Sequence, residues 1–183
     1  ERPGLDPAEV GQVVGGGASR VGEQPFNIAP PAWLAAGLPL GTASTTVDTQ
    51  CGSSQQATNL ATALVAGGVT DVTIGCGVES MSRIPIGANS SKKLGLGVPI
   101  PKPYFGRYEF TSQFEGAERI AERWGISRDD CDRFGLASQE RAARAWAEDR
   151  FAGQLVSVTA PDVDADGNAT GTTHVVDRDE GLR

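Results

Sequence analysis

The sequence has few of the side chains that bind metals or build disulfide frameworks. Its 183 residues include one histidine, His174, and three cysteines, at positions 51, 76 and 131, with no Cys-x-x-Cys pair. A zinc site of the usual kind is therefore not expected. A sparse and odd number of cysteines suits a reducing compartment, which favours a cytoplasmic protein.

Long apolar runs and an excess of positive charge are also missing. No apolar run approaches the roughly 18 to 20 residues that span a bilayer, so no membrane span is expected. The formal net charge of -7 argues against general nucleic-acid binding. The chain opens with Glu1-Arg2-Pro3, without a methionine or an apolar leader. We therefore expect this sequence to start inside a longer protein.

The stretch from Thr45 to Gly68 has the pattern of a strand that runs into a helix. β-Branched residues predict a strand over 44–50, and a sharp turn follows at Cys51-Gly52. The next apolar residues recur at the spacing of one helical face, which predicts a helix over 52–67. They are Ala57, Leu60, Ala61, Leu64 and Val65.

Cys51 stands where this strand and this helix meet. Unpaired backbone N–H groups and the positive end of a helix dipole stabilise a thiolate over a thiol. The small neighbours Gly52 and Ser53 leave room for a substrate. The local pattern leaves two interpretations open: a nucleophilic cysteine, or a small buried side chain at the base of a core helix.

Further elements flank this unit. We expect a short strand over 10–14, a helix over 28–36 capped by Asn27, and a second strand over 71–76. A strand–helix–strand unit favours a parallel sheet with a right-handed crossover, and chemistry in such sheets collects at the carboxyl ends of strands. Cys76 and Cys131 lie in apolar patterns and are predicted to be packed core thiols.

The segment from Arg83 to Arg107 carries five positive charges and no carboxylate. It would either meet a polyanionic ligand, such as a nucleotide phosphate, or serve as a solvated connecting arm. Helices are predicted over about 114–124 and 128–150, and a hairpin over 155–160 and 172–176. His174 lies in this hairpin and is predicted to be structural. The tip at Asp162–Gly167 begins like a calcium loop, but Thr173 stands where the loop needs glutamate, so calcium is not expected.

Two stretches resemble a known family. The residues from Val47 to Gln56, with those from Gly75 to Ser82, closely resemble the thiolases, that is, the acetyl-CoA acetyltransferases and 3-ketoacyl-CoA thiolases. Weaker similarity covers the rest of the chain, at 24–29, 113–115, 125–129 and 178–183. The resemblance favours the nucleophile interpretation, because the matching cysteine of the family takes the acyl group of an acyl-CoA as a thioester.

The resemblance implies an α/β fold in two parts. Residues 1–82 would form part of the thiolase N-terminal core, a mixed, largely parallel sheet with helices on both faces. Residues 83–183 would form an inserted α+β loop or lid domain that binds CoA. Gln113 would line the acyl or pantetheine channel, and Arg183 would contact CoA. CoA and acyl-CoA would be substrates, with no other cofactor and no metal, and the protein would be a homodimer or a tetramer.

The implied activity is thiolysis of a 3-ketoacyl-CoA, or the reverse Claisen condensation, in fatty-acid or sterol degradation. The family's Gly-His-Pro, Cys-x-Gly-Gly and Asn-Glu-Ala-Phe motifs do not occur in these residues, so we expect a fragment of a longer chain. Two alternatives stay open: a non-catalytic acyl-CoA-binding or partner module with the same fold, and a relative of the ketoacyl synthases.

Overall fold

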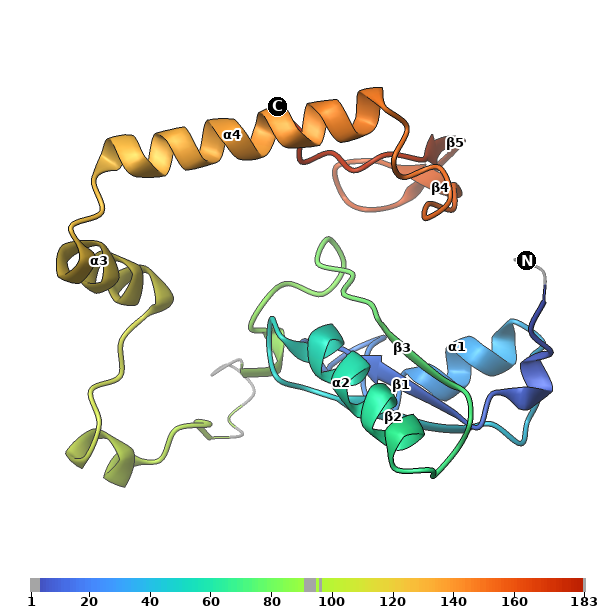
Figure 1. The fold of residues 1–183 in the computed structure, drawn as a ribbon. Coiled ribbons are helices and arrows are strands. Elements are labelled where there is room, and N and C mark those ends of the chain that lie inside the picture. The colour runs from blue at the N-terminus through green and yellow to red at the C-terminus, as the bar shows by residue number, and fades with distance from the viewer. Residues whose placement is uncertain (1–3, 91–94, 96, 183) are drawn as a thin grey trace. The chain divides into compact units, whose positions relative to one another are not determined.

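The structure is a computed structural model that describes residues 4–90, 95 and 97–182 (Figure 1). Its contacts divide the chain into two units, Glu1–Gly106 and Arg107–Arg183, which are described separately below. The domain boundary between residues 82 and 83, with a CoA-binding later part, stays a prediction.

A three-stranded parallel sheet forms the centre of the first unit. Strands β1 (Gln12–Gly16), β2 (Ala43–Val47) and β3 (Thr73–Gly77) lie in the order β2-β1-β3, and both outer strands run parallel to β1. Val14 of β1 pairs with Thr45 of β2 and Gly75 of β3. The predicted parallel arrangement is confirmed, although β1 and β3 begin about two residues later than the sequence indicates.

Helices α1 (Ala29–Ala35) and α2 (Ser53–Ala66) cover opposite faces of this sheet (Figure 1). Val13 packs with Ala29 of α1, whereas the next residue, Val14, packs with Ala57 and Ala61 of α2. Successive side chains of a strand point to opposite faces, so β1 supplies both small cores. All of these elements were predicted from local periodicity.

One predicted cap is wrong. Asn27 does not cap α1, which begins after Ile28 without a side-chain cap. Instead the Asn27 amide donates to the Ser44 carbonyl at 2.8 Å, and its Oδ1 accepts from the Thr46 hydroxyl at 2.6 Å. Asn27 therefore ties the start of α1 to strand β2, and this non-local contact stands in place of a cap.

The second unit contains helices α3 (Gln113–Trp124) and α4 (Arg128–Ala147) and a hairpin. Antiparallel strands β4 (Val158–Val163) and β5 (Ala169–Val176) form the hairpin. Both strands include residues that were predicted to belong to the turn, so the turn is shorter than expected. Ser112 caps α3, and Ser127 with Asp130 forms a capping box on α4. Among the described residues, none of the helices is both long and apolar enough to cross a membrane.

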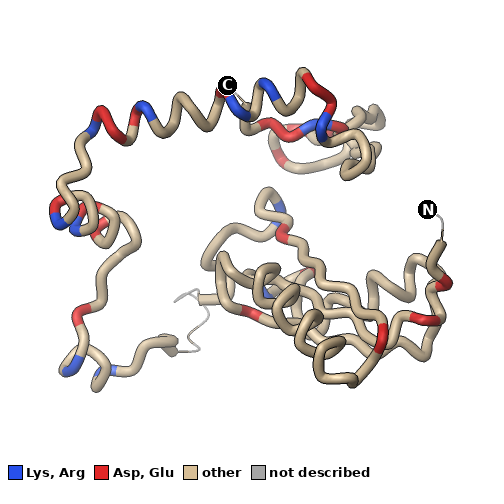
Figure 2. The backbone as a smooth tube through the Cα atoms, in the orientation of Figure 1, with Lys and Arg blue, Asp and Glu red and all other residues tan. Residues whose placement is uncertain are grey.

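Charge is distributed very differently over the helices (Figure 2). Helices α3 and α4 carry both signs, in ion pairs such as Arg119–Glu115 and Arg128–Asp132. Helix α2 carries no charged residue at all. Within α2 itself, therefore, only the peptide dipoles contribute a net field along the helix axis.

Candidate active site at the ends of three parallel strands

The carboxyl ends of the three parallel strands meet around a cavity of about 630 Å³. The segments that follow β1, β2 and β3 all contribute to its lining, and the first turn of α2 closes it. The residues that matter most below are Gly16, Ala18, Cys51, Ser53, Glu79 and Met81. This is the edge of a parallel sheet where ligand sites are usual.

Cys51 lies in this cavity, two residues before the first residue of α2. The thiol is exposed, and Gly52, the residue before α2, provides no side-chain cap. The positive end of the helix dipole therefore faces this region without a capping side chain, which favours an anion there. The sequence predicted Cys51 between a strand and this helix, but the strand ends at Val47 and not at Gln50, so a short turn leads to the cysteine.

A carboxylate that sequence reasoning missed, that of Glu79, also lines the cavity. Glu79 accepts hydrogen bonds from the backbone N–H groups of Ala18 at 2.7 Å and Ser19 at 3.0 Å, and from the Gln24 amide at 2.9 Å. These bonds, above all the one from Ala18, hold the pKa of Glu79 below its usual value. The Gln24 Oε1 accepts from the Ser80 N–H at 2.8 Å. The loops after β1 and β3 are thereby joined.

The other two cysteines are not packed in a core, so that prediction is wrong. Cys76 on β3 and Cys131 on α4 are both exposed. Cys76 points away from α2, because the adjacent Gly75 faces Thr58 of that helix. On the other face of the sheet, the short helix α1 packs on β1 and β2, so it does not cover Cys76 of β3. Partial burial still raises the pKa of the Cys76 thiol, which disfavours its thiolate.

Gln113 and Arg183, the two predicted CoA-binding residues, belong to the second unit, whereas this cavity belongs to the first. Gln113 is the exposed first residue of α3, in the second unit. Arg183 lies outside the described residues, as do Lys92 and Lys93 of the basic segment. Arg83 of that segment pairs with Glu23 at 2.6 Å. The CoA-binding roles therefore stay predictions.

His174 has a partner that the sequence did not reveal. Its Nδ1 lies 2.6 Å from Oδ1 of Asp162 across the hairpin, and the Thr172 hydroxyl donates to the other carboxylate oxygen at 2.5 Å. These two bonds lower the pKa of Asp162. In the described part of the chain, no cluster of three or more His, Cys, Asp and Glu side chains could hold a metal ion.

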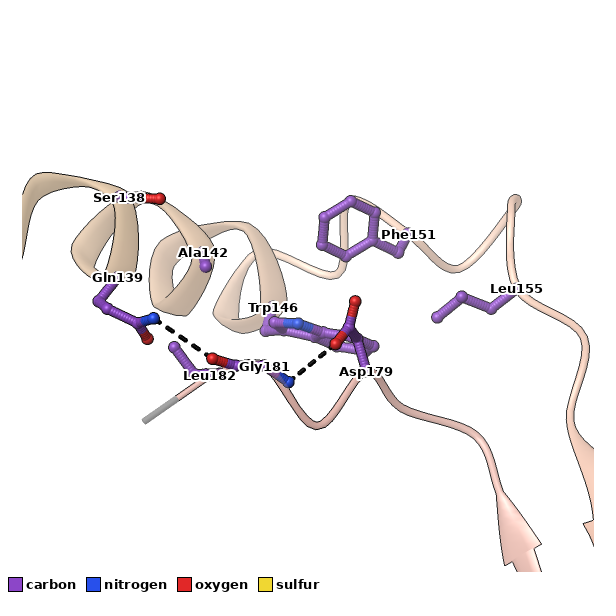
Figure 3. A pocket seen from close by; sticks show the side chains of 9 residues that line it. All are labelled: Ser138, Gln139, Ala142, Trp146, Phe151, Leu155, Asp179, Gly181 and Leu182. Carbon is purple, nitrogen blue, oxygen red and sulfur yellow. Dashed lines mark hydrogen bonds between the residues drawn. The ribbon is translucent and has the colours of Figure 1, made fainter. Parts of the chain in front are cut away.

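A second cavity, of about 400 Å³, lies within the second unit (Figure 3). Trp146 and Leu182 contribute to its mainly apolar lining, and the Gln139 amide donates to the Gly181 carbonyl at 3.3 Å. The Arg178 guanidinium lies 5.1 Å from the centre of the Trp146 ring, a cation–π contact. These contacts fix the segment before Arg183 against α4.

Comparison with known proteins identifies similar chains over the whole sequence. The family model described as "Thiolase, N-terminal domain" matches residues 1–183. The chain is 39% identical over 164 residues to the steroid 3-ketoacyl-CoA thiolase FadA6 of Mycobacterium tuberculosis, covering 86% of this chain and 40% of that protein. It is 34% identical over 189 residues to a beta-ketoadipyl-CoA thiolase of Acinetobacter baylyi, covering 97% and 46% of the two chains.

Among solved structures, the chain resembles the Bacillus anthracis acetyl-CoA acetyltransferase. The TM-score is 0.77 at 27% sequence identity, and the match covers 98% of this chain and 45% of that one. This chain thus spans less than half the length of each of these relatives.

Proposed function

Because this chain belongs to the thiolase family, whose N-terminal domain it carries, we propose that the protein is an acyltransferase in which Cys51 is the nucleophile. The observation that carries the proposal is the position of Cys51, in a cavity at the ends of three parallel strands and beside an uncapped helix terminus. An exposed thiol beside the positive end of a helix dipole is placed to attack a thioester substrate.

The reaction is acyl transfer between CoA thioesters. The Cys51 thiolate attacks the C3 carbonyl of a 3-ketoacyl-CoA, the C2–C3 bond breaks, and its electron pair passes to C2. Protonation of C2 completes acetyl-CoA and leaves the acyl group on Cys51 as a thioester, and the thiol of the incoming free CoA gives up the matching proton when it ionises. The thiolate of free CoA then takes the acyl group and regenerates Cys51. The same steps in reverse give Claisen condensation.

The lining of the cavity favours an apolar acyl group as the group that is transferred. Val78, Met81 and Ile86 lie on this lining, together with small residues of the first turn of α2. An apolar chain or ring held there loses water-exposed surface, which favours binding. Fatty-acid or sterol degradation is the proposed context, and the name of one relative, steroid 3-ketoacyl-CoA thiolase, supports it.

Residues 83–183 are proposed to hold CoA, with Gln113 on the acyl or pantetheine channel and Arg183 on the CoA itself. CoA and acyl-CoA serve as substrates, and no further cofactor is proposed. The assembly is proposed to be a homodimer or tetramer in the cytoplasm, where the three free cysteines would stay reduced.

Alkylation tests the nucleophile directly. All three cysteines are exposed, so accessibility alone predicts similar labelling by iodoacetamide. If the helix terminus activates Cys51, peptide mass spectrometry at neutral pH will find Cys51 labelled well before Cys76 and Cys131. Equal labelling of the three, or faster labelling of another cysteine, would contradict the assignment.

A further inference from the structure

The residue before the proposed nucleophile has an unusual backbone conformation. Gln50 has a φ of 50°, in the left-handed region. For a residue with a Cβ, this region is disfavoured against ordinary conformations by about 5- to 30-fold, whereas glycine enters it freely. Gln50 stays there only if the surrounding structure holds it, because the chain would otherwise relax.

Hydrogen bonds hold both peptide groups of Gln50. Its N–H donates to Oδ1 of Asp48 at 2.9 Å. Its carbonyl accepts from the Ser53 hydroxyl at 2.6 Å and from the Ser53 N–H at 3.0 Å. The Ser53 oxygen also accepts from the Thr49 N–H at 3.1 Å. The Ser53 side chain therefore bonds to the residue before the strained position and to the carbonyl of the strained residue itself.

Ser53 is buried, unlike the other members of this turn. Its exposure is 5%, whereas Asp48, Gln50 and Cys51 are exposed. Water competes poorly for a buried hydroxyl, so these two bonds contribute more to holding the turn than exposed ones would. As the first residue of α2, Ser53 also fixes the turn to the helix.

We propose that Ser53 is a positioning residue for Cys51. Its hydroxyl holds Gln50 in the left-handed conformation, and that conformation directs the Cys51 thiol toward the cavity at the terminus of α2. The hydroxyl acts through the backbone and takes no part in the chemistry. The inference rests on the proposed function, because the position of the Cys51 thiol matters for activity only if Cys51 is the nucleophile.

A double-mutant experiment separates positioning from simple packing. Ser53→Ala removes both bonds, and Gln50→Gly removes the penalty that the bonds oppose. The measurement is the rate of iodoacetamide labelling of Cys51 divided by that of Cys131 in the same molecule, by peptide mass spectrometry. Thr62→Ala is the matched control, because it removes a hydroxyl that bonds to the Thr58 carbonyl on the same helix, at an exposed position.

We expect Ser53→Ala to lower the labelling ratio about 5-fold or more, and the added Gln50→Gly to restore most of it. Thr62→Ala should leave the ratio unchanged. A low ratio in Ser53→Ala that Gln50→Gly does not restore would overturn the inference, since loss of packing would then be the cause. An unchanged ratio in Ser53→Ala would overturn it too, while leaving the proposed function intact.

Two further measurements keep these outcomes distinct. A wild-type ratio near one would refute the proposed function itself, and the inference with it. If Ser53→Ala alone fails to fold by circular dichroism, the double variant with Gln50→Gly is compared directly with the wild type, because the glycine removes the penalty that the lost Ser53 bonds opposed. A ratio close to that of the wild type is then the expected result, and a ratio several-fold lower would overturn the inference.

Discussion

A single added methyl group at Gly16 should push the first turn of α2 off the sheet. A Cβ built there would lie 2.5 Å from the carbonyl carbon of Ser53, 2.6 Å from the nitrogen of Ser54 and 2.7 Å from the Ser53 oxygen. All three are backbone atoms of α2, so no side-chain rotation relieves the overlap. Gly16 thus permits a close approach of strand and helix that any other residue prevents.

The expected cost of Gly16→Ala follows from that geometry. Overpacked positions typically cost about 1 to 3 kcal/mol, and the upper end applies where backbone has to move. For a chain of 183 residues, each kcal/mol lowers the melting temperature by about 2 to 4 °C. Labelling of Cys51 by iodoacetamide should also slow, because the displaced helix no longer lies beside the thiol.

Gly41→Ala is the matched control for this substitution. A Cβ at Gly41 meets nothing within 4 Å, and its φ lies outside the left-handed region. Its effect on stability should stay within about 0.5 kcal/mol. Thermal unfolding followed by circular dichroism compares the two variants with the wild type. If Gly16→Ala melts at the same temperature as Gly41→Ala, the close packing of β1 against α2 is refuted.

Two further predictions concern the cavity wall and the second unit. Glu79→Ala leaves the N–H groups of Ala18 and Ser19 without their acceptor and should lower the free energy of unfolding, measured with denaturant, by about 1 to 3 kcal/mol. A loss no larger than that of an ordinary surface variant would contradict the stabilising role of these hydrogen bonds. The pKa of Glu79 is lowered on folding, so its contribution is full above the ordinary value of 4.5 and is lost as pH falls below it. Glu79→Gln should therefore lose less stability than the wild type between about pH 5 and pH 3. Ser127→Ala removes the cap of α4 and should cost about 1 kcal/mol, measured as loss of helix on heating, whereas Ser138→Ala within α4 should be nearly neutral.

Local patterns predicted the elements of this chain well. The spacing of Ala57, Ala61 and their neighbours is a property of one helix, and the capping box of Ser127 and Asp130 lies within four residues. The position of Cys51 followed from the same local pattern, because a strand that ends at a turn into a helix places the turn residue at the sheet edge.

Contacts between distant residues could not be predicted in this way. Asn27 looked like a cap until the structure showed its bonds to strand β2. Glu79 and Ala18 are separated by 61 residues, and nothing near either one indicates the other. Cys76 has an apolar pattern, but its exposure depends on how far α1 extends over the sheet. Such features depend on the tertiary arrangement, which periodicity does not encode.

Detection of an acyl group on Cys51 tests the central claim most directly. The full-length protein is mixed with a 3-ketoacyl-CoA, quenched in acid without added CoA, digested and analysed by mass spectrometry. The account predicts an acyl thioester on the peptide that contains Cys51, its disappearance on addition of CoA, and no transfer in Cys51→Ser. An acyl group on another residue, or transfer that continues in Cys51→Ser, would contradict it.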